Sequence, residues 1–140
     1  MVRRASRTAQ ASMEYLAIFA VAVAMTLPLI IIFVTQTGNI RADIAQSEMQ
    51  KAASKIVDSA ESVYFMGYPA QKTLMIDFPS GVNSVDINNN IIEFNLTTDT
   101  HNYLITEESV ANLSGSIRAF EGKHVLVFQS VNNTVYITDQ

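Results

Sequence analysis

The sequence predicts an α+β fold in which one long N-terminal α-helix carries a small C-terminal antiparallel β-domain. Three observations predict this fold. The 26 residues between Glu14 and Arg41 carry no charge. A stretch with apolar residues at three- and four-residue spacing follows them, which is typical of an amphipathic helix. The rest of the chain consists of short β-type runs separated by turn residues.

Composition and charge exclude some classes of protein. Charged residues make up 16% of the chain, below the quarter or so that is usual, and hydrophobic residues reach 49%. The first nine residues hold three arginines and no acid, whereas the remainder holds six basic and 13 acidic groups, a net charge of −7. An acidic body cannot neutralise phosphates, so we expect no nucleic-acid partner. Cysteine is absent, which excludes disulfides and thiolate metal sites.

The uncharged run predicts a helix that crosses a membrane. As an α-helix it would span roughly 39 Å, more than the hydrocarbon core of a bilayer. It is too long for the apolar core of a secretory signal, and no Ala-x-Ala cleavage site follows it. The arginines before it favour a cytoplasmic N-terminus. We therefore expect residues 10–38 to form a hydrophobic helix and the residues after it to lie outside the cell.

Residues 39–67 are predicted to continue this helix in amphipathic form. Only Gly38 and Asn39 interrupt the pattern, and Gly67 followed by Pro69 is a typical helix stop. One helix from about Ala11 to Met66 would be roughly 84 Å long. A protein of this size has no core that could cover such a helix, so it needs lipid and neighbouring chains.

Residues 68–140 are predicted to form an antiparallel sheet, a sandwich or a partial barrel. The apolar face of the amphipathic helix is expected to complete its small core. The alternation of apolar and polar residues predicts seven strands: Lys72–Phe78, Val82–Ile87, Ile91–Thr97, Tyr103–Thr106, Ser116–Phe120, Val125–Gln129 and Val135–Thr138.

Three features of the apolar run each allow two interpretations. Glu14, at its edge, is either an acid at the level of the lipid headgroups or an acid with a cationic partner. Pro28 removes a backbone donor, which gives either a tolerated membrane kink or a bend that lets helices pack. Ala20 and Ala24 either reflect ordinary alanine content or form a small-residue face for close helix contact.

The pattern Gln10-x-Ser12-x-Glu14, between a basic leader and a long apolar helix, resembles the class III signal peptide of archaeal type IV pilins. The resemblance covers Arg3 to about Val34. It implies that a prepilin peptidase cuts the bond between Ala9 and Gln10, which removes residues 1–9 as a leader peptide. Thr8 stands at a position where these leaders often carry a basic residue. The family's subunits are lollipop-shaped, which agrees with the predicted fold.

The resemblance also implies a function. The mature chain would be a structural subunit, or pilin, that leaves the membrane and polymerises through its hydrophobic helix into an extracellular pilus at the cell surface. Glu14 would offset the terminal ammonium of Gln10 in a neighbouring subunit, and so set the register. The implied partners are other copies of the chain, the prepilin peptidase, an assembly ATPase and its membrane platform. Whether such a pilus would serve adhesion or another task stays open.

Two other functions stay open at this point. The chain could be a minor pilin-like component of an assembly or secretion machine, which one sequence cannot separate from a major pilin. It could instead be a signal-anchored surface binding domain that never polymerises. A plain anchor gives no reason for the pattern of Gln10, Ser12 and Glu14, and this favours the pilin interpretation.

The β-rich half contains three sequons for N-glycosylation, which begin at Asn95, Asn112 and Asn132. They indicate either a glycoprotein or only a domain rich in Asn and Thr. Nothing in the sequence indicates an enzyme, a metal site or a cofactor. The two histidines, His101 and His124, are far apart in the sequence and are expected on the surface near strand ends.

Overall fold

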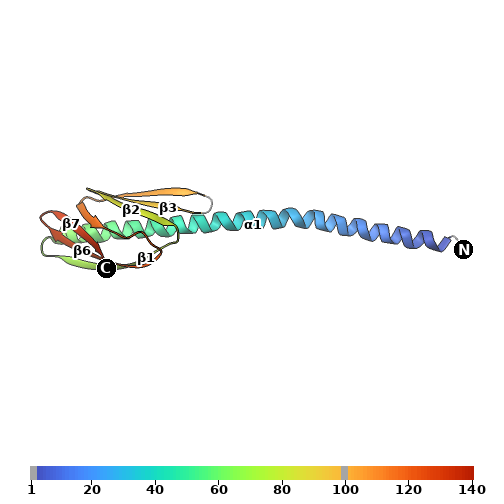
Figure 1. The fold of residues 1–140 in the computed structure, drawn as a ribbon, viewed down its shortest axis with the longest axis horizontal. Helices are drawn as coiled ribbons and strands as arrows, with labels where there is room; N and C mark the ends of the chain where they lie inside the picture. Colours follow the sequence, from blue (N-terminus) through green and yellow to red (C-terminus); the bar gives the residue numbers. More distant parts are fainter. Residues whose placement is uncertain (1–2, 99–100) are drawn as a thin grey trace. The chain divides into compact units, whose positions relative to one another are not determined.

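A computed structural model describes the backbone of residues 3–98 and 101–140, and all of their side chains except those of residues 3–11 and 39. One helix precedes seven strands, so the predicted α+β fold is confirmed (Figure 1). The chain divides into two compact units, one that extends to Asn39 and one from Ile40 to Gln140. The elements are α1 (Arg3–Met66), β1 (Gln71–Phe78), β2 (Val82–Asn88), β3 (Ile91–Thr97), β4 (Asn102–Glu108), β5 (Asn112–Ser116), β6 (Gly122–Val131) and β7 (Thr134–Asp139).

Helix α1 ends where the sequence predicts and begins earlier. It starts at Arg3, eight residues before the expected Ala11, and it runs through Pro28 to Met66. Gly67 then takes a φ of 73°, and its N–H donates to the carbonyls of Val63 and Tyr64. Glycine is favoured at this position because a left-handed conformation costs it nothing.

The strands of the second unit form two sheets. The larger sheet has the order β1-β6-β7-β5, and the smaller has the order β2-β3-β4. Every pair is antiparallel except β5 and β7, which run parallel from the pair Asn112 and Thr134 to the pair Ser116 and Thr138. The prediction of an antiparallel domain is therefore correct for the whole unit apart from this one pair.

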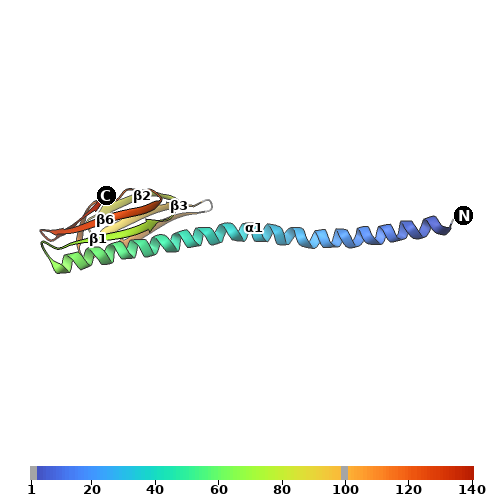
Figure 2. The ribbon, with the colours of Figure 1, turned by 90° about the horizontal axis from the view of Figure 1, so that it is seen from below.

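The last turns of α1 pack against both sheets. At one edge of the helix, Ser54 donates a 3.0 Å hydrogen bond to Glu107 of β4. At the other edge, residues of α1 and β1 line a common groove. β2 and β5 contact each other, which brings an edge of each sheet together. Figure 2 shows β1 alongside this part of α1, with β6 next to β1.

One hydrophobic core joins α1 to both sheets. The buried face of the helix repeats at three and four residues, and the strands contribute alternate residues. The helix therefore completes the core, as the sequence predicts. The fully buried members with the largest side chains are Met49, Ile56, Val63, Ile92, Phe94, Leu96, Leu126, Phe128, Val135 and Ile137.

The predicted strand at Ser116–Phe120 is wrong. Strand β5 lies earlier, at Asn112–Ser116, and residues 117–120 are irregular. The backbone N–H of Arg118 donates to the Asp139 carboxylate at 3.0 Å, so a side chain satisfies this donor in place of a strand partner. Within β5, position 115 requires glycine, because a Cβ there would lie 2.0 Å from the carbonyl oxygen of Ile137.

Candidate functional site

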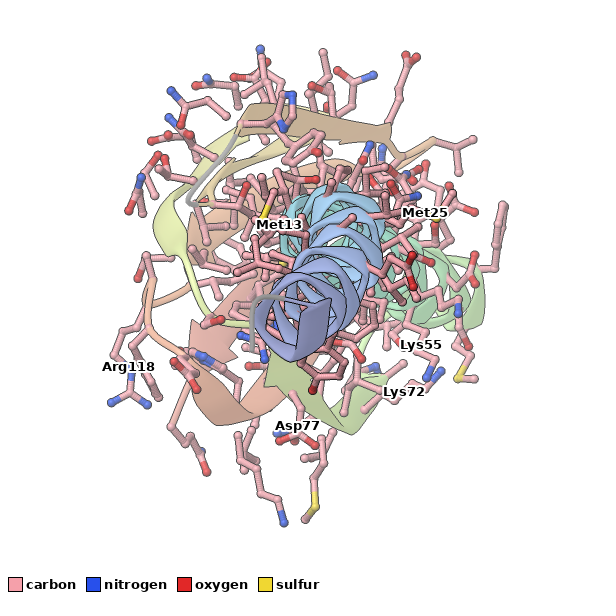
Figure 3. The ribbon with its side chains drawn as sticks, turned by 90° about the vertical axis from the view of Figure 1, so that its right-hand side faces the viewer. Met13, Met25, Lys55, Lys72, Asp77 and Arg118 are labelled. Carbon is pink, nitrogen blue, oxygen red and sulfur yellow. The ribbon has the colours of Figure 1, made fainter. Side chains whose placement is uncertain are left out.

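The first candidate site is the apolar part of α1 in the first unit, residues 12–37, which we call the apolar segment. Its side chains are exposed apart from Val23 and Thr37, which are half-buried. Its most apolar 18-residue window has a mean hydropathy of 2.8, and none of that window is buried. By length and composition, the segment can cross a membrane. Figure 3, which looks along the helix, shows Met13 and Met25 projecting from different sides.

The threonines of the apolar segment do not leave their hydroxyl groups unsatisfied. Thr26 donates to the carbonyl of Ala22 at 2.7 Å, and Thr37 donates to that of Phe33 at 2.9 Å. Thr35 bonds in the same way one turn back, to the carbonyls of Ile31 and Ile32. Hydroxyls that bond within their own helix need no water. The segment is therefore suited to apolar surroundings even at its threonines.

The residues that the sequence indicates for processing and assembly all lie on this helix. Ser12 and Glu14 are exposed near the start of the apolar segment. Ala20 and Ala24 are exposed one turn apart, so they share a face. The side chains of Ala9 and Gln10 lie outside the described residues. The structure therefore places the small-residue face on an accessible surface of the helix, where a second helix could approach.

The second candidate site is a polar cluster at the end of β7 that sequence reasoning missed. His124 was expected on the surface, and this prediction is wrong, because its side chain has 0% exposure. Its Nδ1 lies 2.8 Å from Asp139 Oδ2, and its Nε2 lies 3.0 Å from the carbonyl oxygen of Phe120. Each ring nitrogen therefore has an oxygen acceptor within hydrogen-bond distance. The strict alternation along β6 places His124 on the same side as Leu126 and Phe128, and this was the available signal.

Planar groups stack around this histidine. The ring of His124 lies between those of Phe78 and Phe120, with centroids 4.1 and 4.0 Å away. The guanidinium of Arg118 lies 5.3 Å from the Phe120 centroid on the outer side. Figure 3 shows Arg118 pointing into solvent at the side of the domain. The stack fixes the segment 117–121 against β1 and β6, which is a structural role.

The Asp139 carboxylate connects the members of the polar cluster. It accepts bonds from the side chains of His124 and Arg118 and from the Arg118 backbone. Burial on its own would raise the pKa of the Asp139 carboxyl, but these bonds outweigh burial and lower the pKa. The bond to Asp139 also raises the pKa of the Arg118 guanidinium. Asp139 is therefore a carboxylate at neutral pH, and the cluster holds the C-terminal strand in place.

Polar side chains of the second unit also line a groove. An open groove of about 370 Å³ between α1 and β1 is lined by charged side chains of both signs and by Met75. Lys55 from α1 and Asp77 from β1 are among the lining residues, and both are labelled in Figure 3. Among the residues that the structure describes, no group of three or more His, Cys, Asp or Glu side chains could hold a metal ion. His101, in contrast to His124, is exposed.

The three candidate glycosylation sites are all accessible but lie on different elements. Asn95 is exposed on β3, Asn112 is exposed at the start of β5, and Asn132 is exposed in the turn between β6 and β7. The parallel register places Asn112 directly beside Thr134. Comparisons with known protein families, with curated proteins and with solved structures found no match. Inferences about function therefore depend on the residues and geometry described above.

Proposed function

We propose that this chain is a structural pilin that polymerises into an extracellular, type IV pilus-like filament after cleavage between Ala9 and Gln10. The observation that carries the proposal is the apolar segment, which begins within the Gln10-x-Ser12-x-Glu14 pattern and exposes apolar side chains in every direction beyond it. Such a surface needs lipid before assembly and neighbouring helices after it.

The physical chemistry of the apolar segment says what must drive assembly. Burial of apolar surface contributes about 25 cal/mol per Å² relative to water, but a helix that moves from lipid to a filament core was never in water. Close packing and charge pairing must therefore supply the specificity. Ala20 and Ala24 offer an accessible small-residue face for packing. Glu14 would pair with the terminal ammonium that cleavage creates on Gln10 of a neighbour.

The second unit supports the proposal in another way. Its core is complete without the apolar segment, because among the described side chains of α1 the buried ones begin at Ala42 and end at Val63. A domain with its own core can fold outside the membrane while the rest of α1 stays in lipid. This division allows one helix to serve first as an anchor and later as the filament core.

The N-terminal residue of the protein isolated from cell-surface filaments tests the cleavage step. We expect Gln10, together with the absence of Arg3, Arg4 and Arg7, by mass spectrometry of the N-terminal peptide. A protein that begins at Met1 or Val2 would contradict the proposal and favour an anchored binding domain.

The substitution Glu14→Gln tests the charge pairing. We expect cleavage and membrane insertion to continue while the yield of filaments falls, because the terminal ammonium would lose its partner in apolar surroundings. Glu48→Gln is the matched control, since Glu48 is an exposed acid of the second unit. Normal filaments from Glu14→Gln would show that this carboxylate does not set the register.

The substitution Ala20→Phe tests the packing of the small-residue face. A bulky ring there should prevent close approach of helices, so the precursor should be inserted and cleaved but not assembled. Thr138→Phe, on the exposed side of β7, should reduce assembly much less. Electron microscopy of sheared filaments measures both. Equal effects of the two substitutions would contradict a filament core made by the apolar segment.

A further inference from the structure

The three sequons differ in what surrounds their middle residue. In the first, Asn95 lies in β3, which pairs with β2 on one side and β4 on the other. The middle residue, Leu96, has 0% exposure. The hydroxyl of Thr97 accepts a 2.6 Å hydrogen bond from the Asn83 amide, and the Thr97 N–H donates to the Gly81 carbonyl. The backbone and the hydroxyl of this sequon are therefore already bonded within the sheet.

The second sequon is fixed in a similar way. Asn112 begins β5, which pairs with β7. The middle residue, Leu113, is only 4% exposed, and its N–H donates to the carbonyl of Asn89 in the β2–β3 turn. Removal of this segment from the sheet would expose Leu113 and break its hydrogen bond to Asn89.

The third sequon lies outside the hydrogen-bonded ladder for two of its three residues. Asn132 and Asn133 form the two-residue turn between β6 and β7, and both side chains are exposed. Their φ angles are 46° and 68°, as a type I′ turn requires. Thr134 is half-buried at the first position of β7. Here the middle residue and the acceptor asparagine both face solvent in the folded domain.

An enzyme that glycosylates asparagine must bind the asparagine, the middle residue and the hydroxyl residue together. For Asn95 and Asn112 this requires a buried leucine to leave the core, whereas for Asn132 it requires no change in the core. We propose that Asn132 is the N-glycosylation site of the folded domain and that Asn95 and Asn112 stay unmodified. The inference rests on the proposed function only in that the second unit lies outside the cell.

The chemistry is the transfer of a sugar chain from a lipid-linked donor. The side-chain amide nitrogen of Asn132 forms a bond to the anomeric carbon of the first sugar. The bond from that carbon to the phosphate oxygen of the lipid donor breaks, and the lipid phosphate leaves with the electron pair. The amide nitrogen gives up one proton, which balances the charge.

Turn geometry alone also accounts for asparagine at both positions, because Asn tolerates a positive φ better than most residues. The test therefore needs variants that keep the turn. Asn132→Gly removes the acceptor, and Asn133→Gly keeps it. Both place glycine where φ is positive, so both should fold. The first should lose the sugar completely, and the second should keep it.

The experiment is peptide mapping by mass spectrometry of the full chain isolated from the cells that make it. Trypsin releases Asn132 in the peptide that follows Lys123. A glutamate-specific protease, which cuts after Glu107 and Glu108, separates Asn95 from Asn112. We expect a sugar mass on the Asn132 peptide of the wild type and of Asn133→Gly, and on no other peptide. An unmodified Asn132 peptide, or a sugar on Asn95 or Asn112, would overturn the inference.

The same digest distinguishes failure of this inference from failure of the proposed function. The N-terminal peptide reports cleavage before Gln10, and the C-terminal peptide reports the sugar. A sugar on Asn132 in a chain that keeps its leader would support this inference and contradict the pilin. A chain that begins at Gln10 with Asn132 unmodified would overturn only the glycosylation.

Discussion

The two halves of helix α1 use the same backbone in opposite ways. In the apolar segment, apolar residues surround the helix and stay exposed. In the second unit, apolar residues occupy one face, from Ala42 to Val63, and that face is buried against the sheets. The difference shows that what stabilises a helix cannot be inferred from its being continuous. The width of the apolar face decides whether the helix needs a domain or an apolar surrounding.

The change from a helix that is apolar on all sides to one that is apolar on one face is gradual along the sequence. Ile40 and Ile44 lie in the second unit but are about half exposed on the outer side of α1. Asp43 and Glu48 occur on the same stretch, where the buried face has already begun. The apolar surface therefore narrows over about two turns of helix, and charged residues replace it.

Removal of the apolar segment should have the largest effect on the comparison. A protein of residues 40–140 should be soluble and monomeric in water, because it keeps the complete core and loses the exposed apolar surface. The full chain should need detergent. Size-exclusion chromatography and circular dichroism measure both properties. Aggregation of the shortened protein would show that the first unit also stabilises the domain.

Substitution of two isoleucines in the second unit tests how much the buried face of α1 contributes to the free energy of unfolding. Ile56→Ala should lower the free energy of unfolding by about 2–5 kcal/mol, since Ile56 is fully buried. Ile44→Ala, on the same helix but 52% exposed, should change it by less than about 0.5 kcal/mol. Urea unfolding of residues 40–140 gives both values. A similar loss for both would mean that the faces of the helix are assigned wrongly.

The sequence predicts most of the fold because its signals are local. The C-terminal end of α1 follows from Gly67, and strands β1, β2 and β3 follow from alternating residues between turn signals. Strand β5 could not be predicted in this way, because it contains Asn112, Gly115 and two serines. It forms through parallel pairing with β7, a partner distant in sequence. Such pairing has no local signal.

The two candidate sites also differ in whether a local signal in the sequence indicates them. The apolar segment is visible in composition, and the structure has a helix there that is long and apolar enough to cross a membrane. The polar cluster joins Arg118, His124 and Asp139 from three segments, and no spacing in the sequence indicates that they meet. Only the alternation along β6 shows that His124 faces the core. Cleavage before Gln10 and filament assembly stay predictions.

Acid should weaken the second unit through Asp139. The folded pKa of this carboxyl lies below its ordinary value, so its contribution to stability is present above the unfolded pKa of about 4. That contribution is lost as the pH falls through the lower, folded pKa. Asp139→Asn should cost about 1–3 kcal/mol at pH 7, and its stability should depend less on pH below 4. Asp86→Asn, at an exposed site on β2, is the control.

Thermal unfolding of residues 40–140 between pH 2 and pH 7 tests this prediction. The difference in stability between wild type and Asp139→Asn should shrink as the pH falls. An unchanged difference across the whole range would mean that the Asp139 charge does not stabilise the fold.

Substitution of two glycines, one inside α1 and one directly after it, should have the smallest effects on stability, with opposite signs. Gly38 lies inside α1 with open space around its Cα, so Gly38→Ala should stabilise the helix there by about 0.5–1 kcal/mol. Amide hydrogen exchange around residue 38 of the full chain in detergent should slow by about two- to fivefold.

Gly67 also has open space, but its φ of 73° strains any other residue. Gly67→Ala should therefore destabilise the second unit by about 1–2 kcal/mol, which urea unfolding measures. If both substitutions stabilised the chain, the left-handed end of α1 would not be what stops the helix. If Gly38→Ala changed nothing, glycine would not weaken the helix at residue 38.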